Sequence, residues 1–163
     1  MGRVSFEEKQ IMAYRIEGLD PAAFADTRSL LAAGAIRMTA EQSNAYPCRI
    51  TLEDAQPGES LILLNHVSAD VATPFRASHA IFIREQAGAA SRHVDAVPPV
   101  VARRATSLRG FDAAGMIRDA ILAQPGEADA GIRRLLEKEE IVHVDIHTAT
   151  WGCFLARAER YDA

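Results

Sequence analysis

Residues 141–160, IVHVDIHTATWGCFLARAER, decide the fold. Apolar and polar side chains alternate in residues 141–147 and again in residues 152–160. This period of two is typical of β-strands that are buried on one face. Between the strands, residues 148–152 end in a glycine, which can adopt the positive φ that a short connection requires. The stretch therefore predicts a C-terminal β-hairpin with one apolar and one polar face.

The apolar face of this hairpin indicates its register. Cross-strand partners share a face, so the apolar residues of the two strands should be matched with each other. We expect Cys153 opposite His147, and Arg157 opposite His143. A slip by one residue would place Cys153 and Arg157 among the apolar groups, which is costly. The polar face is therefore predicted to hold a cluster of His143, Asp145, His147, Cys153 and Arg157.

The rest of the chain adds strands and two helical regions. Strands are expected at residues 11–16, 48–53, 61–64, 80–84, 100–106 and 116–122. Helices are expected at residues 21–33, in one piece or two, and at 127–140, where the apolar residues have helical spacing. Strands and helices do not alternate. We therefore expect an α+β fold in which residues 1–163 form a single domain, with a mostly antiparallel sheet of five to seven strands covered by about two helices.

Composition limits the class of protein. The chain has 163 residues, of which 48% are hydrophobic and 25% charged, as in globular domains with a buried core. Its formal net charge of -4 argues against a general nucleic-acid binder. The sequence shows neither an apolar run long enough to span a membrane nor the apolar segment of a secretion signal. We therefore expect a cytoplasmic protein in which Cys48 and Cys153 stay reduced.

Arginine accounts for 16 of the 18 cationic residues. Biased codon usage is one explanation of this excess. The functional explanation is that guanidinium groups bind carboxylate or phosphate through paired hydrogen bonds. Four arginines are candidates for that role: Arg49 at the start of a predicted strand, Arg76 in an irregular segment, Arg109 beside a turn expected at Gly110, and Arg157 on the hairpin.

The histidines of residues 143–147 could carry acid–base chemistry. Imidazole and carboxylate groups transfer protons and bind metals. His143 and His147 lie roughly 13.5 Å apart along a strand, so we expect no metal there. We assign catalysis to His147, Asp145 and Cys153, with His147 oriented by Asp145, and ligand binding to Arg49, Arg76, Arg109, His143 and Arg157. The alternative is a solvated sheet face with an Asp–His hydrogen bond and a packed thiol.

Several stretches together resemble a family of small bacterial proteins, domain of unknown function 1203. They are residues 47–49, 52–55, 57–59, 61–65, 74–78, 80–84, 109–112 and 152–154, with His143, His147 and Arg157. The resemblance covers the chain from about residue 40 onward. Two positions depart from it: His79 replaces the expected glycine, and Phe75 replaces the usual tyrosine, which weakens any catalytic role there. The family has no assigned activity, so the resemblance implies one cytosolic domain and supplies no mechanism.

The sequence thus predicts a site for a small anionic ligand, with no cofactor and no nucleic-acid or membrane partner. The motifs of dinucleotide-binding, P-loop, α/β-hydrolase and EF-hand proteins are absent from the sequence. The alternative is a non-enzymatic interaction or regulatory module, a homodimer that pairs through an exposed strand edge. Convergence of the named arginines and histidines favours the first function, whereas a large, flat apolar contact favours the second.

Overall fold

Two antiparallel sheets make up the fold in the computed structural model, which describes residues 12–162. The strands are β1 (Tyr14–Glu17), β2 (Ile36–Thr39), β3 (Ser60–Ala69), β4 (Ala77–Arg84), β5 (Arg92–Val94), β6 (Thr106–Phe111), β7 (Ile117–Ala123), β8 (His143–Thr148) and β9 (Phe154–Arg160). One sheet has the order β5-β1-β9-β8-β6-β7 and the other β2-β3-β4. The α+β class, the antiparallel sheet and the C-terminal hairpin β8–β9 are confirmed. That residues 1–163 form one domain stays a prediction.

The helices are short. They are a 3-10 helix η1 (Pro21–Phe24), α1 (Thr27–Ala32), α2 (Pro99–Ala102) and α3 (Ala128–Leu136). The expected helical region 21–33 is present in two pieces, because Asp20 and Asp26 each cap a separate N-terminus with their side chains. The amphipathic helix expected near the C-terminal hairpin is α3.

The six-stranded sheet has one apolar and one polar face. Its apolar face packs with α3 into the main core, where Leu108, Ile132, Leu135, Val144 and Ile146 are all fully buried. Residues of β6, β8 and β9 that alternate with these core positions point to the other face. That polar face includes the histidines and arginines that the sequence singled out.

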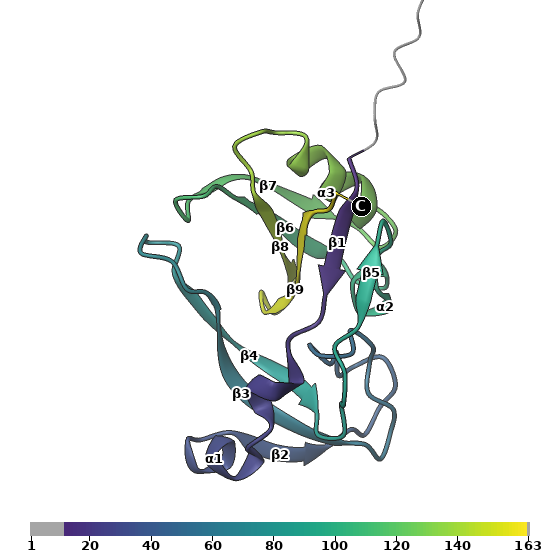
Figure 1. Cartoon of the computed structure of the whole chain (residues 1–163). Coiled ribbons are helices and arrows are strands. Elements are labelled where there is room, and N and C mark those ends of the chain that lie inside the picture. Colours follow the sequence, from purple (N-terminus) through teal and green to yellow (C-terminus); the bar gives the residue numbers. More distant parts are fainter. Residues whose placement is uncertain (1–11, 163) are drawn as a thin grey trace, which may run out of the picture.

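The hairpin β3–β4 lies along this polar face. It begins beside β2 and α1, where Ile62, Leu64, Ile81 and Ile83 form a second core, and extends toward the six-stranded sheet (Figure 1). At its tip, the hydroxyl of Thr73 donates a hydrogen bond of 2.7 Å to the carbonyl of Gly115, in the β6–β7 connection. The hairpin is therefore held to the six-stranded sheet at its far end.

Residues 48–53 do not form the expected strand. Leu52 has a positive φ of 54°, and its backbone N–H donates to the carbonyl of Cys48, so the segment is a compact loop. The apolar alternation has a different cause. Cys48 and Ile50 fill the core beside the hairpin, whereas Leu52 fills the main core.

Two further expectations were wrong. The strand expected at residues 100–106 is instead helix α2 followed by the start of β6, because Pro99 at the first helical position favours a helix start. The turn expected at Gly110 is the middle of β6. A Cβ at Gly110 would lie 2.5 Å from Cδ1 of Ile141, so the glycine makes room for that side chain. Among the described residues, no helix is long and apolar enough to cross a membrane.

Gly18 offers a test of how the loop 48–52 is held. A Cβ at Gly18 would lie 1.8 Å from the backbone oxygen of Ile50, which cannot move without the loop. We predict that Gly18→Ala lowers the free energy of unfolding by about 3 kcal/mol in urea titrations. At Gly88 an added Cβ meets no atom within 4 Å, so Gly88→Ala is the matched control and should change stability by less than about 0.5 kcal/mol. Equal effects of the two substitutions would contradict the packing described.

Candidate functional site

A buried ion pair lies at the centre of the polar face. Asp145 of β8 is fully buried, and Arg157 of β9 lies directly opposite it in the sheet. The guanidinium donates to both carboxylate oxygens, with Nε–Oδ1 at 2.7 Å and Nη2–Oδ2 at 3.1 Å. Nη2 also donates to the carbonyl of Ser68 on β3, at 3.0 Å. Arg157 thus joins the six-stranded sheet to the hairpin β3–β4.

This pairing corrects the expected register. Arg157 was expected opposite His143, but His143 lies opposite Glu159, a displacement of two residues that keeps the faces unchanged. A β-bulge between Ile146 and His147 then places Phe154, rather than Cys153, opposite His147. The predicted polar face is therefore present, but its residues have different cross-strand partners from those expected.

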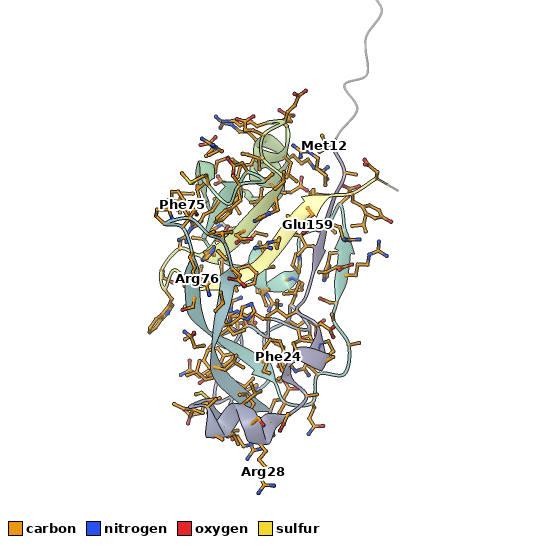
Figure 2. All side chains as sticks on the ribbon, turned by 60° about the vertical axis from the view of Figure 1, so that its left-hand side comes forward. Met12, Phe24, Arg28, Phe75, Arg76 and Glu159 are labelled. Atoms are coloured by element: carbon orange, nitrogen blue, oxygen red, sulfur yellow. The ribbon has the colours of Figure 1, made fainter. Side chains whose placement is uncertain are left out.

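Aromatic rings fill the contact between the hairpin and the polar face. His66 of β3 and His79 of β4 are direct cross-strand partners. The ring of His79 lies 4.9 Å from that of His147, and the ring of His66 lies 6.0 Å from that of Phe154. We call the region formed by His66, Ser68, His79, Arg109, His147, Phe154 and Arg157 the seam. Phe24, labelled in Figure 2, borders the seam, because its ring lies 6.1 Å from that of His66.

His147 has a fixed ring orientation. Its residue is only 2% exposed, and its Nδ1 lies 2.9 Å from the carbonyl oxygen of Gly152. A carbonyl can only accept, so Nδ1 carries the proton and donates it. The pKa of His147 is lowered to about 4, chiefly by burial and in addition by the charges of Arg109 and His79, while the Gly152 carbonyl and Asp145 oppose the shift. His147 is oriented by Gly152, and not by Asp145 as the sequence suggested.

Arg109 points toward His147. It lies on β6, opposite Asp145, and its Nε lies 3.2 Å from the hydroxyl of Ser107. Ser107 is the direct cross-strand partner of His147. The Arg109 side chain therefore folds along β6 toward the row that contains His147. Its charge also lowers the pKa of His79, after the larger effect of burial.

His143 lies at the other end of β8. Its ring stacks on Phe111 at a centroid distance of 5.1 Å, and its Nε2 lies 3.7 Å from Asp145. Burial lowers its pKa, and the Arg157 charge adds to that effect. Since Asp145 lies between His143 and His147 on the strand, the two histidines belong to different surroundings, and His143 is not part of the seam.

Arg49 and Cys153 lie at the edge of the seam. Arg49 is 3% exposed and donates to the carbonyls of Phe154 and Pro47, at 2.7 Å and 2.6 Å. Burial lowers the pKa of Arg49 to about 10, and Cys153 is the nearby group that most opposes this shift. The thiol of Cys153 donates weakly to the carbonyl of Trp151, and within residues 12–162 no hydrogen bond joins it to His147.

Arg76 lies apart from the other named residues. It is in the turn between β3 and β4, where it pairs with Asp70 and is 55% exposed. Phe75 of the same turn lies at the edge of the molecule in Figure 2. In the β6–β7 connection, Asp112 binds Nε of Arg118 at 2.5 Å and leaves Arg109 without an ion pair among the described residues.

Sequence reasoning missed His66, Ser68 and Phe154. His66 and Ser68 continue the alternation of Ile62 and Leu64 on β3, so a longer strand could have been predicted from that pattern. Their position against His147 depends on a contact between two sheets, for which the sequence carries no local signal.

The described residues contain no group of three or more His, Cys, Asp or Glu that could hold a metal ion. A cavity of about 160 Å³ borders the seam at Arg157 and is also lined by Arg15, Glu17 and Glu159. Its two cations and two anions balance, so it offers no net attraction for an anion. A larger one, of about 380 Å³, lies between η1 and the three-stranded sheet.

Comparison with known proteins gives a family and no activity. The model of a family described as protein of unknown function (DUF1203) matches residues 45–160. That range includes β3 to β9, and therefore every residue of the seam. Neither the curated proteins nor the solved structures gave a match.

The neutral state of His147 predicts a pH dependence of stability. Its pKa falls from 6.5 in the unfolded chain to about 4 in the fold. As the pH drops through this window, the unfolded chain gains a proton that the folded chain does not bind. Unfolding free energy should therefore fall between pH 6.5 and pH 4, with up to about 3 kcal/mol from this group.

The measurement is urea unfolding at pH steps across this window, with His147→Gln beside the unsubstituted protein. The variant should lose a clear part of the slope because glutamine does not titrate. An identical slope in both proteins would contradict the account of His147.

Proposed function

The chain belongs to the DUF1203 family of proteins of unknown function, and we propose that it binds a small anion at the seam, with Arg109 as the group that holds the charge. The observation that carries the proposal is the state of the Arg109 guanidinium. Within residues 12–162 it forms no ion pair, and its one hydrogen bond uses Nε. Both terminal nitrogens therefore keep donors for a carboxylate, sulfate or phosphate.

The other arginines of this region are already occupied. Arg157 is bound to Asp145 and to the Ser68 carbonyl. Arg49 is buried and bound to two backbone carbonyls. Arg157 is neutralised by Asp145, whereas Arg49 keeps its charge, because among the described residues no carboxylate lies within hydrogen-bond distance of it. The region around Arg109 therefore has a positive potential.

The neighbouring histidines support anion binding by excluding water. His66, His79 and His147 all have lowered pKa values, chiefly because of burial, and are neutral at pH 7. An ion pair between Arg109 and a ligand is stronger in such surroundings than in bulk water. The proposal places this activity in the bacterial cytoplasm, in line with the expectations from the sequence.

A second function, that of an interaction module, rests on exposed apolar residues. Trp151 in the β8–β9 turn is 87% exposed, and Leu122 at the end of β7 is 64% exposed. Leu122 lies opposite Ser107 in the sheet, so part of this apolar surface borders the seam. A homodimer or a partner protein could cover it. We favour anion binding because Arg109 offers specific donors.

The proposal is tested by thermal unfolding with sulfate, phosphate or succinate. At about tenfold excess over the dissociation constant, an anion that binds the fold should add about 1.4 kcal/mol of stability. For a chain of this size, this raises Tm by roughly 3–6 °C. Arg109→Gln should abolish the shift because it removes the charge and the paired donors.

Arg118→Gln is the matched control. Arg118 lies on β7 of the same sheet, is 51% exposed and is paired with Asp112. This variant should keep the full shift. If none of the three anions raises Tm, or if Arg109→Gln keeps the shift, the proposed function is wrong.

A further inference from the structure

The seam combines an anion-binding group with a hydrogen-bond acceptor. We propose that its ligand is a small hydroxycarboxylate, whose carboxylate binds Arg109 and whose hydroxyl donates a hydrogen bond to Nε2 of His147. This inference rests on the proposed function and names the class of anion. It follows from the tautomer of His147, from the lack of a partner for its Nε2, and from the position of Arg109.

The tautomer makes Nε2 an acceptor. Nδ1 of His147 uses its proton to bind the Gly152 carbonyl. A neutral imidazole carries one N–H, so Nε2 holds a lone pair and no proton. An anionic oxygen cannot donate to it, whereas a hydroxyl group can. A simple anion such as succinate would therefore leave Nε2 without a partner.

Nε2 has no hydrogen-bond partner among the described residues, and His147 is only 2% exposed. In that part of the chain, three buried side-chain polar atoms lack both a partner and solvent contact: the hydroxyl oxygens of Thr51, Ser91 and Thr106. Nε2 of His147 is not one of them, so it still reaches the surface of the seam. A ligand hydroxyl at that surface would give Nε2 the donor that the described residues do not supply.

The position of Arg109 sets the size of the ligand. Ser107, toward which Arg109 points, is the direct partner of His147, and directly opposite residues have Cβ atoms about 5 Å apart. The guanidinium and Nε2 can therefore act on two groups of one small molecule. A 2-hydroxy acid carries its hydroxyl on the carbon next to the carboxylate, the closest arrangement of these two groups in one molecule. His79, whose ring lies 4.9 Å from that of His147, closes the site from the hairpin side.

Malate and succinate make the sharpest comparison, because they carry the same charge and differ by one hydroxyl group. We predict that isothermal titration at pH 7.5 gives a dissociation constant for malate at least tenfold below that for succinate. His147→Phe keeps a ring among the neighbouring aromatic groups but has no acceptor. It should bind both ligands equally.

His93→Phe is the matched control, since His93 lies on the edge strand β5, away from the seam, and should keep the preference for malate. If neither ligand binds the unsubstituted protein while sulfate or phosphate still raises Tm through Arg109, this inference fails and the proposed function stands. If none of these anions binds, both fail. Equal binding of malate and succinate by that protein overturns the hydroxyl contact alone. A preference for malate that persists in His147→Phe also overturns it, because another residue would then read the hydroxyl.

A second measurement uses only the unsubstituted protein, so it does not depend on whether a variant folds. In ¹⁵N spectra of the unsubstituted protein, the Nε2 signal of His147 should have the shift of an unprotonated nitrogen. That signal should move on addition of malate and stay in place with succinate. A protonated Nε2 in the free protein, or equal movement with both ligands, would overturn the inference.

Discussion

The bond network of Asp145, Arg157 and the Ser68 carbonyl is the interaction on which the rest of the site depends. A carboxylate buried in a sheet must be paired, since an isolated buried charge is very costly. Arg157 supplies two hydrogen bonds to Asp145 and uses a third to hold strand β3. The same residue that neutralises Asp145 therefore fixes the hairpin β3–β4 over the polar face of the six-stranded sheet. Together with the Thr73–Gly115 bond at the hairpin tip, it holds His79 against His147.

The packing of the hairpin against the sheet keeps His66, His79 and His147 neutral at pH 7. Each becomes partly desolvated, and nearby arginines add to the cost of a second positive charge. Arginine and histidine therefore have different roles in the seam. Arginine carries the charge at every physiological pH. Histidine, which stays neutral, contributes a hydrogen-bond acceptor and excludes water from the site. In this arrangement His147 is a better binding group than a base, because a pKa of about 4 leaves it little affinity for a proton at neutral pH.

The sequence predicted the faces of the strands better than their neighbours. Alternation in residues 143–147 and 154–160 placed Asp145 and Arg157 on one face, as observed. It could not decide between registers that differ by two residues, because both keep every side chain on its face. The β-bulge after Ile146, which brings Phe154 opposite His147, has no signal in that pattern. Alternation was misleading at Cys48, Ile50 and Leu52, because a loop wedged between two cores also buries every second residue.

The separate three-stranded sheet shows the same limit for long-range contacts. Strand β2 was not predicted, although Ile36 and Met38 alternate with polar residues, because the pattern spans only four residues. Strand β3 carries His66 and Ser68 beyond its apolar part, and their place beside the other sheet rests on contacts between residues far apart in the sequence. Arg109 and Arg157 could therefore be named from the sequence as candidates, but the absence of a carboxylate partner for Arg109 could be seen only in the fold.

A crystal structure of the protein with malate tests the central claim most directly. The account predicts one malate at the seam, with a carboxylate on the terminal nitrogens of Arg109 and the hydroxyl within 2.5–3.2 Å of Nε2 of His147, roughly the range of normal hydrogen bonds. The hairpin β3–β4 should remain in place, with Arg157 still bound to Asp145 and Ser68. Malate bound at the cavity beside Glu17 and Glu159, or a seam that stays empty at saturating malate, would contradict the account.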